Sequence, residues 1–286
     1  MDKAELIEQI KAKSIRDADL SRLDLDGIDL SGCRLENVIL AHEDQQDRVL
    51  RKIDFKGARL EKVFFDGARV EGCDFDGEDT RLNQVSFVRC EIAKCRFRKP
   101  AISWSDFRYT EIADCTFESA KIDFCDFYRS MMVGVDIFRK SKISHCSLYY
   151  AYFDEGATLR RDNLVKGRLL QENRNAYLRF LNDWHEFGTG VRKNDQKKIS
   201  DWSREDSFRE RFAHAEDIYK TLNGLWMSKG YLADANWAYV RGKKMERKRM
   251  IRDLMNRKLS FWYKLELLPR ITWNFMKDIM FGYGES

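Results

Sequence analysis

A strict five-residue period in residues 86–128 constrains the fold more than any other feature of this chain. Every fifth residue there is large and apolar, nine times in succession: Phe87, Ile92, Phe97, Ile102, Phe107, Ile112, Phe117, Ile122 and Phe127. The residue two places before such a centre is usually small, as at Cys95, Cys115 and Ala120. Neither an α-helix, with about 3.6 residues per turn, nor an alternating strand keeps a period of five on one face. The sequence therefore predicts short repeats that stack on one another.

The repeats extend well beyond this stretch and begin with the unit ADLSR at residues 18–22. Centres continue at Leu25, Leu30 and Leu35, and the pattern fades only after Leu164. Residues 18–170 thus resemble the pentapeptide-repeat family, whose consensus is Ala-(Asp/Asn)-Leu-X-X. The resemblance implies a mainly β solenoid, a right-handed quadrilateral β-helix with four five-residue faces per coil. About seven coils would stack about 4.8 Å apart, the spacing of hydrogen-bonded strands.

The central residue and the small residue two places before it must both point into such a coil. With four faces per coil, the alternation of Phe and Ile predicts one aromatic ladder of Phe87, Phe107 and Phe127, with Phe97 and Phe117 opposite. Glycine recurs two places after the centre, where a corner needs permissive backbone angles. It stands at Gly27, Gly32, Gly57, Gly67, Gly72 and Gly77. We expect burial along these ladders to supply much of the stability.

Interruptions of the period predict irregular places in the solenoid. Arg48 falls on an inward small position, where an unpaired cation cannot be buried, so we expect residues 41–51 to bulge out as a loop. Residues 77–80 insert two residues before the pattern restarts. A slip of one residue follows near residues 132–138.

Seven cysteines, Cys95 and Cys115 among them, all occupy the small slot two places before a centre. A free cysteine behaves as a small buried hydrophobe, which suits that slot. Cys95 and Cys115 should lie above one another with parallel Cβ vectors, which disfavours a disulfide. Their spacing is not that of a zinc site, and free thiols fit a reducing compartment.

No catalytic or cofactor-binding pattern emerges from the sequence. The four histidines show no ligand or triad spacing, and phosphate-loop, dinucleotide and nucleophile motifs are absent. Residues 188–190, Gly-Thr-Gly, are interpreted as a turn. We therefore expect a protein that is not an enzyme and holds no cofactor or metal.

The chain divides into three predicted parts: an N-terminal capping helix at 1–17, the β-helix at 18–170 and an α-helical tail at 171–286. The net charge of +5 is divided unevenly, because residues 1–170 hold 29 Lys and Arg against 31 Asp and Glu. That leaves −2 on the repeats and +7 on the tail. The tail pattern favours an αα-hairpin that turns near Gly230.

The tail also contains the candidate contact residues. Residues 241–258 hold nine Lys and Arg against Glu246 and Asp253, and an aromatic-rich amphipathic stretch follows at 261–281. Basic residues beside a Trp/Phe/Leu face describe an interfacial helix, and equally a face buried by a second copy. The candidates for membrane or partner contact are Lys243, Lys244, Arg247, Lys248, Arg249, Trp262 and Trp273.

These observations favour an interaction scaffold or regulatory module over an enzyme. Neither a signal peptide nor a bilayer span is predicted, so we expect a cytoplasmic protein, and its basic, aromatic-rich tail favours a place at the inner face of a membrane. Helices followed by Gly-Tyr-Gly-Glu resemble larger bacterial proteins in which repeats precede a channel-like membrane domain. The expected partners are a protein or a second copy bound through the C-terminal helices, and an anionic membrane surface.

A second hypothesis is a DNA-mimicking protector of gyrase, like the quinolone-resistance members of the family. Those members present a strongly acidic rod. Here the repeats carry only −2, with arginines such as Arg59, Arg69, Arg89, Arg96 and Arg98 on the outer wall. Such a surface imitates phosphates poorly, and we do not expect nucleic acid itself to be a partner of this chain.

Overall fold

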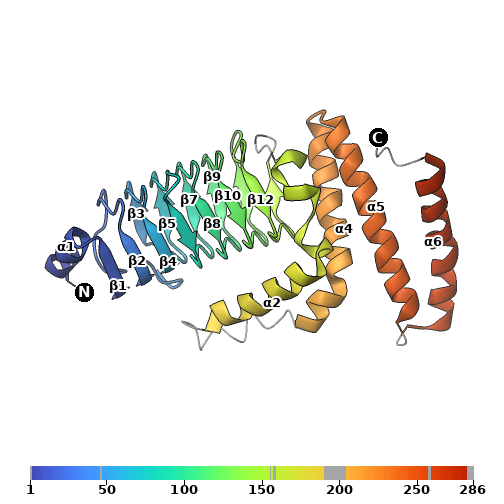
Figure 1. The fold of residues 1–286 in the computed structure, drawn as a ribbon, viewed down its shortest axis with the longest axis horizontal. Helices are drawn as coiled ribbons and strands as arrows, with labels where there is room; N and C mark the ends of the chain where they lie inside the picture. Colours follow the sequence, from blue (N-terminus) through green and yellow to red (C-terminus); the bar gives the residue numbers. More distant parts are fainter. Residues whose placement is uncertain are drawn as a thin grey trace. The chain divides into compact units, whose positions relative to one another are not determined.

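A computed structural model describes residues 2–45, 47–154, 156, 159–189, 204–256 and 259–281 (Figure 1). The chain divides into two compact units, Met1–Leu170 and Gln171–Ser286. The first contains the repeats and the second contains long helices.

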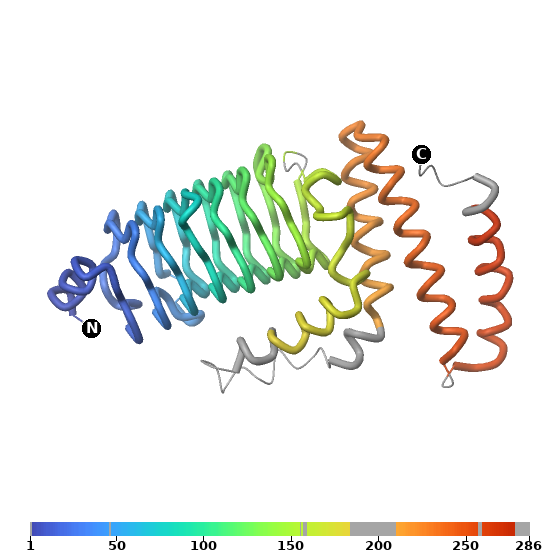
Figure 2. Tube along the Cα trace, in the orientation of Figure 1, coloured from blue at the N-terminus to red at the C-terminus, as the bar shows by residue number. Residues whose placement is uncertain are grey.

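The first unit is a β-solenoid of about seven turns, as predicted; Figure 2 shows its coils following one another along the chain. One wall is a seven-stranded parallel sheet and another is a six-stranded parallel sheet. The first contains β1 (Ser14–Asp19), β2 (Arg34–Ile39), β4 (Arg59–Phe64), β6 (Arg81–Asn83), β8 (Ala101–Ser103), β10 (Lys121–Asp123) and β12 (Lys142–Ser144). The second contains β3 (Val49–Arg51), β5 (Arg69–Glu71), β7 (Glu91–Ala93), β9 (Glu111–Ala113), β11 (Met131–Val133) and β13 (Tyr152–Phe153). Isolated parallel bridges join the coils on the remaining walls.

The N-terminal helix is present but shorter than predicted. Helix α1 spans Lys3–Lys11, with the Asp2 carboxylate accepting from the Glu5 amide as its N-cap. Strand β1 already begins at Ser14 and pairs with β2, so the first repeat precedes Ala18. The sequence pattern did not indicate this first repeat, because the place two residues before its buried centre Ile15 holds Lys13 instead of a small residue.

Strand register confirms the two smaller interruptions. Paired residues of β6 and β8 lie 20 positions apart, the length of an uninterrupted coil. From β4 to β6 the offset is 22, which accommodates the two inserted residues. From β10 to β12 it is 21, the predicted slip of one residue.

The largest interruption differs from the prediction. Strand β3 begins at Val49, so the irregular segment ends at Arg48 instead of Arg51. Arg48 is not expelled: its guanidinium donates to the backbone oxygens of Leu23 at 2.6 Å, Leu40 at 3.3 Å and Leu20 at 3.4 Å. Carbonyl oxygens satisfy this half-buried cation, because buried donors need acceptors and not necessarily an anion.

The core contains both aromatic ladders. Phe87, Phe107 and Phe127 stack at centroid distances of 5.0 and 4.9 Å, and Phe97 stacks on Phe117 at 4.5 Å. The two ladders meet edge to face, at 6.3 Å between Phe107 and Phe117. The alternating isoleucines are equally buried: Ile92, Ile102, Ile112 and Ile122 are each at most 1% exposed.

The corners adopt the left-handed conformation, and glycine is only one way to reach it. The six predicted glycines have φ between 64° and 124°. Lys94, Trp104 and Tyr109, at the same place in later coils, have φ of 55°, 52° and 58°. Each of these three amides donates to a carbonyl of the next coil at 3.0 or 3.1 Å. We infer that these bonds offset the cost of about 1–2 kcal/mol for an L-residue in this region.

The second unit is built from α2 (Arg174–Thr189), α4 (Arg204–Ser228), α5 (Leu232–Met255) and α6 (Phe261–Phe281). Short 3₁₀ turns at Arg161–Asn163 and Val165–Gly167 precede it, and a third, Leu170–Glu172, begins at the last residue of the first unit. Helices α4 and α5 form the predicted hairpin, turning at Gly230 with φ of 72°. Tyr219 and Trp237 meet edge to face at 5.5 Å in its core. A Cβ added at Gly242 would lie 3.4 Å from the Cβ of Tyr219, so glycine permits the close approach of the two helices.

Candidate functional surfaces

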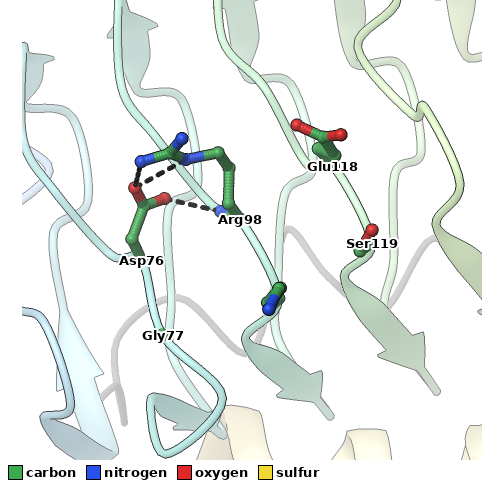
Figure 3. Close-up of a pocket in the computed structure, with 6 residues that line it drawn as sticks. Asp76, Gly77, Arg98, Glu118 and Ser119 are labelled. Carbon is green, nitrogen blue, oxygen red and sulfur yellow. Dashed lines mark hydrogen bonds and ion pairs between the residues drawn. The ribbon is translucent and has the colours of Figure 1, made fainter.

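A shallow hollow on the solenoid is lined by Asp76, Gly77, Arg98, Lys99, Glu118 and Ser119 (Figure 3). Its charges neutralise one another. The Asp76 carboxylate accepts from the Arg98 amide at 2.7 Å and from its Nε at 2.8 Å. Lys99 pairs with Glu78 at 2.9 Å, and Arg139 pairs with Glu118 at 2.7 Å.

These pairs set the ionisation of the hollow. The hydrogen bond from Arg139 holds the pKa of Glu118 below its ordinary value, and the bond from Lys99 does the same for Glu78. Both acids are therefore anionic near neutral pH. Ser119 is the only hydroxyl of the lining and has no histidine beside it there. The hollow is a ladder of ion pairs between coils and offers no nucleophile with a base.

A second cluster, Asp106, Arg108 and Asp126, is nearly buried on the outer side of the solenoid wall. The Arg108 guanidinium binds the Asp106 carboxylate at 2.6 to 3.0 Å. Asp126 lies farther away, 4.0 Å from the Arg108 Nε, and accepts from the Tyr128 amide at 2.9 Å. Burial, together with the negative charge of Asp106, raises the pKa of Asp126 to about 7.

The sequence pattern did not single out this cluster. Asp106 and Asp126 stand 20 residues apart, one coil, so the spacing itself was a signal that two carboxylates stack. A carboxyl with a raised pKa is a candidate acid or base. Asp126 is only 7% exposed, however, and the Ser147 hydroxyl that hydrogen-bonds it is itself buried, at 6% exposure. We assign it a structural role.

The seven cysteines are all free and buried. The Cys95 thiol lies 3.4 Å from the Ala93 oxygen and 3.5 Å from the Val70 oxygen, and Cys115 repeats this arrangement one coil later. The Cys115 sulfur accepts from the Cys95 amide at 3.3 Å. Hydrogen bonding to Cys115 and Cys73, with burial, raises the pKa of Cys95. No group of three or more metal-ligating side chains occurs within the described residues.

The predicted basic contact residues on α5 are largely engaged inside their own unit. Lys243 pairs with Glu246 at 2.8 Å, and Arg249 pairs with the buried Glu216 at 3.0 Å. The Arg247 guanidinium lies 5.5 Å from the Phe275 ring, and the Lys248 amine lies 5.7 Å from the Phe212 ring. Lys244 is half-buried. The structure therefore gives Lys243, Arg247 and Arg249 partners inside the unit, whereas Lys248 is exposed.

The predicted tryptophans lie on a different surface. Helix α6 contacts α5, and Leu267 and Asn274 are its buried residues, at 3% and 7% exposure. Trp262 and Trp273 are 74% and 59% exposed. Five further exposed apolar residues accompany them: Phe261, Leu265, Leu268, Phe275 and Met276.

These seven residues lie on one side of α6. Successive residues of an α-helix are rotated by about 100°, which centres the seven on the side away from Leu267. Phe275 lies at the edge of this side, with its ring 5.5 Å from the Arg247 guanidinium of α5. We call this surface the α6 apolar face. Among the described helices, none is long and apolar enough to cross a membrane.

Comparison with known proteins identifies the repeats. The family model of pentapeptide repeats matches residues 14–42 and 48–77, in eight copies. The gap between the two matches falls on the irregular segment before β3. The chain is a pentapeptide-repeat protein. Its repeats form a scaffold in the structural sense, a rigid solenoid with its side chains arrayed in columns.

Solved pentapeptide-repeat structures match the solenoid only distantly. QnrB1, described as a plasmid-mediated fluoroquinolone resistance protein, is 14% identical in a trypsin-treated form and covers 58% of this chain and 83% of its own, with a TM-score of 0.33. The protein alr5209 from Nostoc Pcc 7120 is 16% identical, covering 58% and 94% with a TM-score of 0.29. HetL from Nostoc sp. strain PCC 7120, involved in heterocyst differentiation regulation, is 13% identical, covering 57% and 94% with a TM-score of 0.23. A search of curated proteins gave no significant match.

Proposed function

We propose that this pentapeptide-repeat protein is a non-enzymatic interaction scaffold that associates with a membrane surface through α6. The α6 apolar face carries the proposal. A helix that packs on its neighbour through Leu267 and Asn274 leaves two tryptophans and five other large apolar side chains exposed. Exposed apolar surface of this extent marks a binding site.

The composition of α6 favours a position in the plane of the membrane. The apolar sequence of α6 contains the charged residues Lys264, Glu266 and Arg270, and Pro269 lies near the middle of the helix. Charged residues on one side and Trp, Phe and Leu on the other are typical of interfacial helices. Tryptophan in particular is enriched at the boundary between headgroups and acyl chains.

The engagement of the α5 cations changes the expected lipid preference. The basic sequence of α5 predicted binding to an anionic membrane surface. In the structure, however, Glu246 pairs with Lys243 and Glu216 pairs with Arg249. Apolar burial by α6 then provides most of the affinity, with a modest contribution from Lys264 and Arg270. We therefore propose binding to zwitterionic as well as anionic bilayers, with weak dependence on salt.

Under this proposal the solenoid is a cytosolic module held at the inner face of the membrane. Several of its surface charges pair between coils, as Asp76 and Arg98 do in Figure 3, and its outer walls would be available to a protein partner. The residues that resemble the junction to a channel-like domain, Gly-Tyr-Gly-Glu at 282–285, lie outside the described residues.

Flotation with liposomes tests the proposal. The wild-type chain should float with vesicles of phosphatidylcholine and with vesicles containing phosphatidylserine. Replacing Trp262 and Trp273 by alanine should lower the bound fraction at least tenfold, because burying each aromatic side chain contributes about 1.5–3 kcal/mol. The control replaces Met227 and Leu232, two exposed apolar residues at the α4–α5 turn, at 54% and 64% exposure. A wild-type chain that stays unbound, or equal flotation of all three chains, would rule out the membrane role.

DNA mimicry with gyrase protection remains the second hypothesis, and the surface argues against it. Arg34, Arg59 and Arg81 are aligned in consecutive coils of the seven-stranded sheet. Arg34 pairs with Glu36 and Glu61 of the same sheet, so this column offers paired charges where a phosphate backbone offers a row of anions. Failure of the chain to protect gyrase from a quinolone in a supercoiling assay would remove this hypothesis.

A further inference from the structure

One corner of the solenoid carries an alternating column of arginine and tyrosine. Arg89, Tyr109, Arg129 and Tyr150 each stand two places after a buried centre in four successive coils, all with φ between 53° and 58°. All four are exposed, Tyr109 at 43% and Tyr150 at 57%. We call this set the Arg–Tyr corner.

The side chains of the corner hold one another in place. The Arg89 guanidinium lies 5.8 Å from the Tyr109 ring. The Arg129 guanidinium lies 5.8 Å from the Tyr150 ring and 5.3 Å from that of Tyr128. Such cation–π contacts limit rotamer freedom before any partner arrives, which lowers the entropic cost of binding.

Backbone pairing along the corner excludes one mode of recognition. The Tyr109 amide donates to the Tyr128 oxygen at 3.0 Å, and the Arg129 amide donates to the Tyr149 oxygen at 3.3 Å. An added β-strand needs unpaired backbone groups at an edge, and these amides are already used by the next coil. A partner at the corner must therefore be recognised by side chains.

The polar groups of the corner are donors. A guanidinium has five N–H donors and no acceptor, and a tyrosine hydroxyl can donate. Arg89 pairs with Glu43, whereas no carboxylate of the described chain pairs with Arg129. A proline-rich segment is the complement of such a surface, because proline offers a carbonyl acceptor and no N–H.

The spacing of the corner matches the same ligand. Neighbouring phenylalanines of the ladders beneath it are 4.5 to 5.0 Å apart, so two coils advance the column by nearly twice that distance. A polyproline II helix rises about 3.1 Å per residue with three residues per turn, and so repeats about every 9.3 Å. Tyr109 and Tyr150, two coils apart, can thus meet the same face of that helix on successive turns.

We propose that the Arg–Tyr corner is a binding site for a proline-rich polyproline II segment of a partner protein. The two tyrosine rings pack against prolines, and Arg129 between them donates to the carbonyl oxygens of the ligand. Met131 and Tyr152, 37% and 57% exposed on the adjoining wall, extend the apolar part of the site. This site is separate from α6, and neither proposal depends on the other.

Binding of a fluorescent proline decamer, measured by anisotropy, tests the assignment, with a Gly-Ser decamer of equal length as the reference peptide. The wild-type chain should bind the proline decamer saturably and the Gly-Ser decamer not at all. The Tyr109→Ala/Tyr150→Ala variant should bind at least tenfold more weakly. Tyr109→Phe/Tyr150→Phe should retain most of the affinity, because the rings remain.

The matched control is Lys94→Ala/Lys140→Ala, which changes two left-handed corner residues on other edges of the solenoid. Its affinity should equal that of wild type, and circular dichroism should show all variants folded. No saturable binding of the proline decamer at millimolar concentration, or equal binding by wild type and Tyr109→Ala/Tyr150→Ala, would overturn the proposal.

Discussion

Replacing Asp126 with asparagine should stabilise the solenoid at pH 8 and leave its stability nearly unchanged at pH 4. Asp126 is almost buried, and the nearest cation, Arg108, is committed to Asp106. When Asp126 is protonated the three groups are neutral together, and when it ionises they carry a net negative charge out of water. This is why its pKa is raised from 3.8 to about 7.

The size of the effect follows from that pKa. The difference between 7 and 3.8 is about three pH units, and at about 1.36 kcal/mol per unit it corresponds to about 4 kcal/mol. Because the folded-state pKa is the higher one, the protonated carboxyl favours folding fully below pH 3.8, and this contribution is lost as the pH rises through about 7. Asparagine keeps an oxygen for the Tyr128 amide and does not ionise.

Native-state hydrogen exchange of the β8 and β10 amides measures the opening free energy of this part of the solenoid alone. Asp126→Asn should exceed wild type by up to about 4 kcal/mol at pH 8 and by little at pH 4. Glu91→Gln is the control, since the Glu91 side chain is 66% exposed and its replacement should change the opening free energy little. If Asp126→Asn is no more stable than wild type at pH 8, or if its advantage is the same at both pH values, the reasoning fails.

Three further predictions concern the core, the corners and the thiols. Phe107→Ala should lower the free energy of unfolding by about 3–5 kcal/mol in urea titrations, since a fully buried ladder member is removed, whereas the exposed Val135→Ala should not. Gly67→Ala should lower the melting temperature far more than Gly27→Ala, because its Cβ would lie 2.9 Å from the Glu43 oxygen while that of Gly27 meets nothing. The buried cysteines, whose pKa is raised at Cys90 and Cys146, should react with a disulfide reagent only after unfolding; labelling of the native chain would contradict this.

The sequence predicted most of the solenoid because its period has a direct geometric cause. The five-residue period, combined with the four-walled coil that the family resemblance implies, predicted the Phe87 and Phe97 ladders. Breaks in the period predicted the two smaller insertions. The period did not predict the hydrogen-bond acceptors of Arg48, because these are backbone carbonyl oxygens, which every residue has. The universal left-handed corner was missed for a related reason: inter-coil hydrogen bonds, not glycine, stabilise it at Lys94.

The candidate surfaces were only partly predictable, since they depend on residues brought together by packing. The charge count on α5 was correct, but Arg249 meets Glu216 from another helix, 33 positions away. The pKa of Asp126 likewise depends on a neighbour one coil away. The amphipathic pattern of α6 was visible in the sequence, whereas which of its sides meets α5 required the structure.

Insertion of Trp262 and Trp273 into a bilayer is the most direct test of the central claim. Vesicles whose acyl chains carry bromine quench tryptophan fluorescence only on close contact. We predict strong quenching in the wild-type chain and its loss in Trp262→Phe/Trp273→Phe, which keeps an apolar face and still floats with the vesicles. Absence of quenching in the wild type, or equal quenching in both chains, would contradict membrane association through α6.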